Sequence, residues 1–213
     1  SIATQASPAR DWQPYSKAGG YRRWYGFTDR VVHWRLDGAD IRAHAASRPQ
    51  NVPYYFRPAI EWSDVGHFDL GARYRPAGYI FDVVAMSLFE EDDDERKLLA
   101  TMAYLNSSFA GNLLNSLSSG MHYSVGYVAK LPDPGWVPDH VLEWAGKCVE
   151  LAKADWERNE TSEGFCGWIA PDHRGPSTAR EWAREIAEHE RRSLERARDL
   201  EVAIDAFFCE LMG

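Results

Sequence analysis

The fold class is decided by the stretch Pro76-Ala77-Gly78-Tyr79-Ile80-Phe81-Asp82-Val83-Val84 and by the acidic run Glu90 to Glu95, which follows it shortly afterwards. The turn signal before Tyr79 and the aromatic and β-branched residues of 79–84 predict a strand. The acidic run predicts a helix start, because negative charge is favourable near a helix N-terminus. Apolar residues then recur at helical spacing until Ser118-Ser119-Gly120: Leu98, Met102, Leu105, Phe109 and Leu113. A strand and then an amphipathic helix over about 95–117 indicate a mixed domain.

Upstream and downstream segments extend this pattern. Residues 1–20, rich in Ser, Ala, Pro and Gly, predict an irregular lead-in. Aromatic and β-branched runs, none of them cleanly alternating, predict the short strands of a curved sheet. The predicted strands are Val31 to Trp34, Tyr54 to Phe56, Ile60 to Trp62 and Tyr123 to Val128.

The chain from residue 139 onward is typical of helices. One helix is predicted over about 139–157, followed by a Gly- and Pro-containing loop over about 160–177. Thr178, with Glu181 three residues later, forms a capping-box signature for a second helix, which we expect to be an antiparallel partner of the first. Its apolar side runs through Trp182, Ile186, His189, Ala197, Leu200, Ile204, Phe207 and Leu211.

These elements predict an α+β protein in three parts. Residues 1–20 form the lead-in, and residues 21–135 form a curved mixed β-sheet domain backed by the helix near 95–117. Residues 136–213 form an α-helical extension that packs on this domain or on further parts of the protein.

The net charge of the 213-residue chain is −8, which by itself disfavours nucleic acid as a partner. The charge is unevenly distributed, however. Residues 1–80 have a net charge of +4 and residues 81–213 a net charge of −12, and 10 of the 11 basic residues in the first part are Arg. Arg suits bidentate contacts with guanine edges and phosphates, although an Arg-rich solvated surface explains the composition equally well.

Cysteine use and hydropathy bound the cellular context. Cys148, Cys166 and Cys209 are scattered, which disfavours a zinc site or a disulfide framework and favours a reduced, cytoplasmic compartment. No apolar stretch approaches the length of a bilayer span, so we expect no membrane partner.

Two segments resemble parts of an active site without completing one. Asn51-Val52-Pro53-Tyr54 is similar to the Asn-Pro-Pro-Tyr tetrad of amino-methyltransferases, but Val occupies its second position. The nearest candidate for a cofactor loop, Asp69-Leu70-Gly71-Ala72-Arg73, has Arg where Gly would let the backbone approach the ligand. Asp139, Glu143 and Lys147 are similar to a metal-dependent nuclease signature, but they share one predicted helix, whereas such a site needs its residues on adjacent strands. The acidic run Glu90 to Glu95 lacks the ligand spacing of a calcium loop. His67 and His122, in turn-like segments, are candidate donors to phosphate or bases, but an isolated His is more often structural. We therefore expect no catalytic residue and no metal site.

Several segments, in a fixed order along the chain, carry a family resemblance. They include Arg23-Trp24-Tyr25-Gly26, Ser47-Arg48-Pro49-Gln50-Asn51, Ile60-Glu61-Trp62-Ser63, Arg75-Pro76-Ala77-Gly78, Leu105-Asn106-Ser107, Tyr123-Ser124-Val125-Gly126 and Lys153-Ala154-Asp155-Trp156. In this order they resemble the C-terminal region of PglX-type adenine-specific DNA methyltransferases of BREX phage-defence systems. The middle part is also similar to the specificity domain of TaqI-like restriction-modification enzymes.

The resemblance implies that 21–135 is a DNA target-recognition domain for a site-specific adenine N6 methyltransferase. It also implies that the methylation tetrad and the S-adenosylmethionine site lie upstream, so that this chain is a non-catalytic C-terminal fragment without a cofactor of its own. Its expected partners are double-stranded DNA, the parent's methyltransferase domain and other defence-system proteins.

The candidate DNA contacts fall into two groups. Arg22, Arg23, Arg48 and Arg57 are predicted to contact phosphates or guanine edges, and Gln50, Asn51, Ser63 and His122 to contact base edges. Trp24, Tyr25, Trp34 and Trp62 either lie in the core or flank the groove. The alternative function is a protein-interaction module whose acidic helical half assembles a defence complex, and an unrelated hydrolase is a third and weaker candidate.

Overall fold

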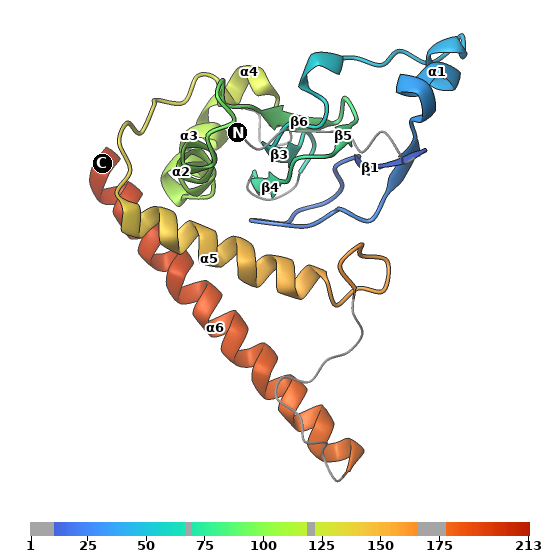
Figure 1. The fold of residues 1–213 in the computed structure, drawn as a ribbon. Helices are drawn as coiled ribbons and strands as arrows, with labels where there is room; N and C mark the ends of the chain where they lie inside the picture. Colours follow the sequence, from blue (N-terminus) through green and yellow to red (C-terminus); the bar gives the residue numbers. More distant parts are fainter. Residues whose placement is uncertain (1–10, 67–69, 119–121, 166–177) are drawn as a thin grey trace.

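The computed structural model describes residues 11–66, 70–118, 122–165 and 178–213, which form an α+β fold with two small sheets (Figure 1). The first sheet contains β1 (Trp12–Ser16), β2 (Val31–His33) and β5 (Ile80–Phe81), in the order β2-β1-β5. Strand β1 is antiparallel to β2 and parallel to β5, so this sheet is mixed.

The second sheet is antiparallel, with the order β4-β3-β6. Its strands are β3 (Ala59–Ser63), β4 (Arg73–Arg75) and β6 (Ala85–Leu88). All five residues of the central strand β3 are buried, so both of its faces are covered. The expected single curved sheet is instead two three-stranded sheets, because none of these six strands pairs with a strand of the other sheet.

Helices surround the second sheet and extend away from it. They are α1 (Arg35–Ala43), the 3-10 helix η1 (Val52–Tyr54), α2 (Glu95–Leu105), α3 (Ser108–Leu117), α4 (Val125–Val128), α5 (Asp139–Trp156) and α6 (Ala179–Met212). Figure 1 shows α5 and α6 running antiparallel, with the N-terminal half of α6 projecting beyond the rest of the molecule. The predicted helix pair is confirmed, and the hydroxyl of Thr178 caps α6 by accepting a hydrogen bond from the Glu181 amide at 3.2 Å.

Two hydrophobic clusters hold these elements together. The larger one joins β3, α2, α3, α5 and α6 and includes Trp62, Met102 and Phe208. The smaller one lies around the first sheet and includes Trp34, Tyr55 and Phe81. Trp24, Tyr25, Trp34 and Trp62 are all buried, so the core interpretation of these aromatic residues is correct. The helical extension packs through the larger cluster onto α2 and α3.

The predicted helix over 95–117 is wrong in one respect, because the chain breaks between α2 and α3. The buried Asn106 side chain donates to the Ala72 carbonyl at 3.0 Å and accepts from the Ala72 amide at 2.9 Å. Ser107 then adopts an extended conformation, and its hydroxyl caps α3 by accepting from the Ala110 amide. The helical spacing of the apolar residues continues across the break, so the pattern could not reveal it. The acidic start is confirmed, since Asp94 caps α2.

Three predicted segments differ from the structure near Pro and Gly. Residues 54–56 do not form a strand, because Asn51 is left-handed (φ 59°) and Pro53 lies in the first turn of η1. Within the segment 123–128, Val125–Val128 form the short helix α4 in place of a strand; its first turn closes on the Ser124 carbonyl, and Val128 packs on the larger cluster. The strand predicted over 79–84 is paired only at Ile80 and Phe81.

The predicted lead-in contains one regular element. Residues 12–16 form β1 because they pair with both β2 and β5, which lie later in the chain. Residues 1–10 of the lead-in, His67, the turn residues 119–121 and residues 166–177 of the predicted loop lie outside the described residues.

Candidate nucleic-acid interface

A buried ionic cluster joins the two sheets and fixes the body that carries the candidate site. The Glu61 carboxylate on β3 accepts hydrogen bonds from Arg73 at 3.1 Å, from Arg75 at 3.0 Å and from the Ser16 hydroxyl on β1 at 2.5 Å. Burial lowers the pKa of both guanidinium groups, and the neighbouring Glu61 charge opposes that effect. Two of the N-terminal arginines are therefore structural.

Arg22 and Arg23 are used to attach the helical extension. Arg22 donates to the Ala152 carbonyl at 3.0 Å and to the Asp155 carboxylate at 2.6 Å, both on α5. Arg23 lies 3.7 Å from the Glu201 carboxylate on α6, which also accepts from the Trp24 indole at 2.5 Å. These contacts position α5 and α6 against the sheets.

Arg57 and Ser63 are also engaged within the protein. Arg57 donates to the Asp93 carboxylate at 2.8 Å and to the Glu90 carbonyl at 2.5 Å, and so holds the loop before α2. Ser63 is buried and donates to the Gly20 carbonyl at 3.0 Å. His122 is exposed, and its Nδ1 lies 3.4 Å from the Asp64 carboxylate; it does not line the cavity described next.

The structure brings three of the predicted residues together. Arg48, Gln50 and Asn51 are exposed and line one side of a cavity of about 260 Å³ next to α1. Asn51 has a left-handed backbone (φ 59°), which ends the extended segment at this cavity and begins η1. No ion-pair partner of Arg48 occurs in the described parts of the chain. Its side chain is exposed.

The opposite walls of this cavity are aromatic and acidic. Trp34, Tyr55 and Phe81 line it, and the Tyr55 ring is edge-on to both others, with centroid distances of 5.4 and 5.3 Å. Asp82 also lines the cavity, and its carboxylate accepts from the Tyr15 hydroxyl at 2.5 Å. Burial and this hydrogen bond raise the pKa of Tyr15, so Tyr15 remains a neutral donor.

Tyr15 and Asp82 are site residues that the sequence did not reveal. Tyr15 lies within the predicted lead-in, and Asp82 interrupts an apolar run that the alternation rule assigns to a strand. An Asp directly after a buried strand was the only available signal. A second cavity of about 460 Å³ adjoins the first, because Asn51, Phe81 and Asp82 line both.

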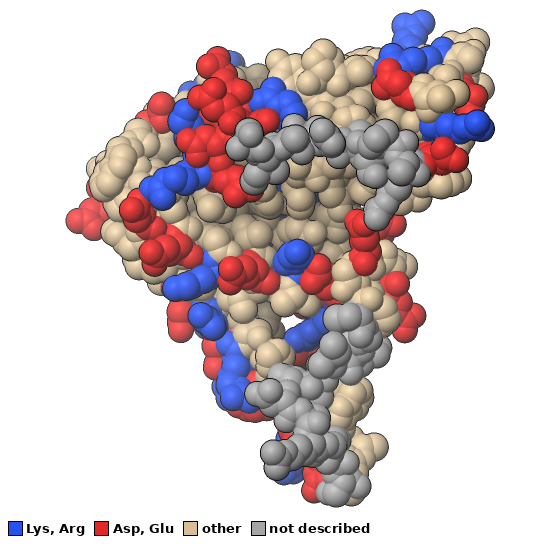
Figure 2. Space-filling view, viewed as in Figure 1, with Lys and Arg blue, Asp and Glu red and all other residues tan. Residues whose placement is uncertain are grey.

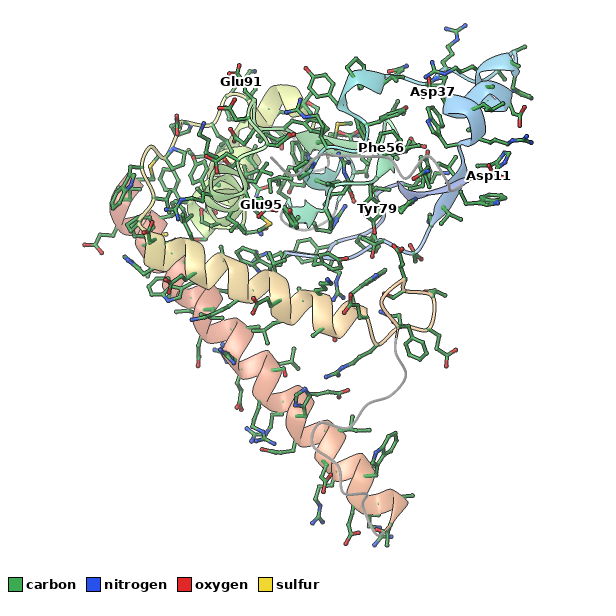
Figure 3. All side chains as sticks on the ribbon, viewed as in Figure 1. Asp11, Asp37, Phe56, Tyr79, Glu91 and Glu95 are labelled. Atoms are coloured by element: carbon green, nitrogen blue, oxygen red, sulfur yellow. The ribbon has the colours of Figure 1, made fainter. Side chains whose placement is uncertain are left out.

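The surface charge around the cavity is mixed. Figure 2 shows basic and acidic atoms side by side at the corner formed by α1, where Arg42 pairs with Asp37 at 3.1 Å. The acidic residues Glu91 and Glu95 lie well away from Asp37 on α1 in Figure 3. A polyanion that approaches the α1 corner therefore does not meet the whole acidic run.

The segment that resembles a cofactor loop does not fit S-adenosylmethionine. Gly71 has a φ of +64°, and a Cβ at this position would lie 3.0 Å from the Arg22 carbonyl oxygen and 3.1 Å from the Tyr21 ring. The space next to Gly71 is thus occupied by the protein's own backbone and the Tyr21 ring, and the following residue, Ala72, is fully buried. In the segment Asn51-Val52-Pro53-Tyr54, Asn51 is the N-cap and the other three residues form η1.

Searches of the described residues found neither a metal-binding group nor a membrane span. Within these residues, no cluster of three or more His, Cys, Asp or Glu side chains has an arrangement that could hold a metal ion. None of the described helices combines the length and the apolar content needed to cross a bilayer.

Comparison with known proteins indicates a class of enzyme. No protein-family model matches the chain. The curated relatives that it does match are adenine-specific methyltransferases. This chain is therefore homologous to part of proteins of that class.

One relative is the adenine-specific methyltransferase PglX of Lacticaseibacillus casei (strain Zhang). It is 32% identical over 172 residues, which cover 78% of this chain and 14% of the relative. Another is the adenine-specific methyltransferase BrxX of Escherichia coli O9:H4 (strain HS), which is 29% identical over 164 residues, or 77% of this chain and 13% of the relative. The chain thus spans a small fraction of the length of the relatives that it matches.

Proposed function

We propose that this chain recognises the DNA sequence for a site-specific adenine N6 methyltransferase of a phage-defence system and is itself non-catalytic. Its similarity to the adenine-specific methyltransferases PglX and BrxX supports the methyltransferase context. A position in the C-terminal region of such a protein, as a TaqI-like recognition domain, belongs to the same proposal.

The observation that carries the proposal is the exposed cluster of Arg48, Gln50 and Asn51 beside the first cavity. A guanidinium group pairs with the O6 and N7 acceptors of guanine or with a phosphate, and side-chain amides pair with the N6 and N7 of adenine. Three such side chains within four residues can contact neighbouring base pairs. A good bidentate base contact contributes about 1–3 kcal/mol of discrimination.

The remaining predicted residues have supporting roles in this proposal. Arg22 and Arg23 hold α5 and α6, Arg57 holds the loop before α2, and Ser63 fixes the turn at Gly20. His122 is exposed and would make a separate contact at a distance from the cluster. S-adenosylmethionine belongs to the parent's methyltransferase domain, because the Gly71 segment is occupied by the chain's own packing.

Fluorescence anisotropy with labelled duplex DNA, at low and at moderate salt, tests the proposal with the full 213-residue chain. We expect weak binding that decreases with salt, because phosphate contacts release counterions. Arg48→Ala should weaken binding and reduce the slope of log K against log[salt] by about 1 if Arg48 contacts one phosphate. Arg198→Ala is the matched control, because Arg198 is an exposed arginine on α6.

Two results would contradict this function. Methyl transfer from S-adenosylmethionine to DNA by this chain alone would contradict the non-catalytic assignment. Absence of binding at low salt, or equal binding by the Arg48→Ala variant, would favour the alternative of a protein-interaction module. The alternative is supported by the projecting α6, on which Leu194 is 71% exposed and Val202 is 60% exposed.

A further inference from the structure

The cavity beside Arg48 has aromatic walls and a half-buried carboxylate. A protein that only contacts the surface of a regular duplex does not require them. Three of its walls are the aromatic rings of Trp34, Tyr55 and Phe81, and a half-buried carboxylate, Asp82, lies beside them. A side chain that reads a base edge in a groove needs only a polar group at the surface. The recessed aromatic walls therefore indicate that part of a ligand enters the protein.

The size of the cavity limits what can enter. Its volume of about 260 Å³ is just below the range of roughly 300–1,000 Å³ that is usual for drug-sized ligands. The Tyr55 ring stands nearly perpendicular to the Trp34 and Phe81 rings, at 75° and 82°, so the walls meet at about right angles. A single flat ring system is of the size that this space can hold, and it would meet the small exposed parts of these rings, which are 7–8% exposed.

The polar groups favour a ring with N–H donors. The Asp82 carboxylate accepts from the Tyr15 hydroxyl and, at 3.2 Å, from the Val84 amide. A carboxylate offers about four acceptor positions, so two are still free. Gln50 and Asn51 also line the cavity, and their side-chain amides supply further donors and acceptors.

Arg48 at the same cavity argues against a small organic cation as the ligand. An aromatic pocket with a carboxylate could also hold an alkylammonium group. The guanidinium group of Arg48 repels such a cation, whereas it attracts the phosphate that every nucleotide carries. The observations together favour a nucleotide.

We propose that this cavity receives one nucleobase that has left the DNA stack, and this inference rests on the proposed DNA-recognition function. The base enters beside the exposed edges of Tyr55, Trp34 and Phe81, its N–H groups donate to Asp82, and Arg48 holds the adjoining phosphate. Guanine is the best-fitting base, because its N1–H and its exocyclic amine can both donate to one carboxylate. Extruding a base costs least where the base is already unpaired, which makes the proposal testable.

The test compares three labelled duplexes of one sequence by anisotropy with the full chain. One duplex is fully paired, one has a single bulged guanosine, and one has an abasic residue at the same bulge. We expect the guanosine bulge to bind about tenfold more tightly than either of the others, because only this duplex offers an already unpaired base that can contact Asp82 and the cavity walls. Ser47→Trp, which fills the cavity from its half-buried wall, should abolish that preference.

Ala45→Trp is the matched control, because Ala45 is exposed two residues away and does not line the cavity. It should retain the tenfold preference. Asp82→Asn, which preserves the shape of the side chain, provides a second variant in case Ser47→Trp does not fold. It should reduce the preference for the guanosine bulge.

The outcomes separate this inference from the function on which it rests. Equal binding of all three duplexes, with Arg48→Ala still weakening it, would overturn base capture and leave DNA recognition intact. An abasic bulge that binds as tightly as the guanosine bulge would show that the protein reads a bend and not a base, which also overturns it. Failure to bind any duplex at low salt would overturn the proposed function itself.

Discussion

The Glu61 carboxylate accepts a hydrogen bond from Arg75 Nη1 at 3.0 Å, and both side chains are almost completely buried, at 3% and 2% exposure. Arg73 donates to the other carboxylate oxygen of Glu61. One carboxylate thus compensates two guanidinium groups between the sheets. Each guanidinium also lies over an aromatic ring, Phe81 for Arg75 and Phe27 for Arg73.

Replacing Glu61 should therefore be among the most destabilising single substitutions in this chain. We expect Glu61→Gln to lower the free energy of unfolding by about 3–5 kcal/mol, because two buried positive charges lose their counter-ion. Urea denaturation of the variant and of the exposed control Glu91→Gln measures the difference. A loss similar to that of the control would show that the cluster contributes little.

Asn106 connects the break between α2 and α3 to the Ala72 backbone. Asn106→Ala removes two buried hydrogen bonds and leaves the Ala72 amide unsatisfied, whereas the Ala72 carbonyl still accepts from the Trp24 amide at 2.8 Å. We expect a loss of roughly 1–3 kcal/mol for the amide left without a partner. Asn112→Ala, at an exposed position on α3, is the control and should be close to neutral. Comparable denaturation midpoints for the two variants would contradict the prediction.

Phe208 attaches the C-terminal half of α6 to the larger cluster. It is fully buried and packs against Tyr104, with the ring centroids 5.5 Å apart. We expect Phe208→Ala to destabilise the protein by about 3–5 kcal/mol. Leu194→Ala, on the projecting half of the same helix, should change stability by less than about 0.5 kcal/mol. Equal effects of the two substitutions would mean that α6 packs differently.

Gly38 determines the position of Trp34, one wall of the first cavity. It has a φ of +71°, and an added Cβ would lie 2.7 Å from the Trp34 ring. Gly135 has nearly the same φ, +70°, but an added Cβ would meet nothing within 4 Å. Both alanine variants incur the left-handed strain of roughly 1–2 kcal/mol. Gly38→Ala should also displace Trp34, and near-ultraviolet circular dichroism would detect this displacement. Equal spectra and equal stability of the two variants would contradict the steric effect.

Alkaline pH should destabilise the protein. Burial raises the pKa of Tyr79, and burial together with a carboxylate partner raises the pKa of Tyr15 and Tyr74. The unfolded tyrosines ionise near pH 10, while the folded ones remain protonated, so the folded state binds more protons above that pH. Stability from these groups is complete below about pH 10 and falls as the pH rises further. Denaturation at about pH 8 and about pH 10.5 checks this expectation, and an unchanged free energy of unfolding would contradict it.

Several elements were predictable from sequence because their signals are local. Asp94 and Thr178 begin α2 and α6 through hydrogen bonds to amides within three residues, and the apolar periodicity after them reports one buried face. The α+β class and the helix pair α5 and α6 follow from such patterns. The break at Asn106 was not predictable, because it depends on the backbone of Ala72, which is 34 residues away.

The candidate site shows the same division between local and distant effects. The sequence by itself determined that Arg48, Gln50 and Asn51 lie together in a polar, turn-rich segment, and that the N-terminal part is rich in Arg. It could not determine which arginines are available, because Glu61, Asp93 and Asp155 reach their partners only through folding. The tertiary structure alone decided that Arg22, Arg57, Arg73 and Arg75 support the fold, and that Tyr15 and Asp82 meet beside Arg48. Ion pairing and burial depend on distance in space, and the order of residues along the chain does not specify that distance.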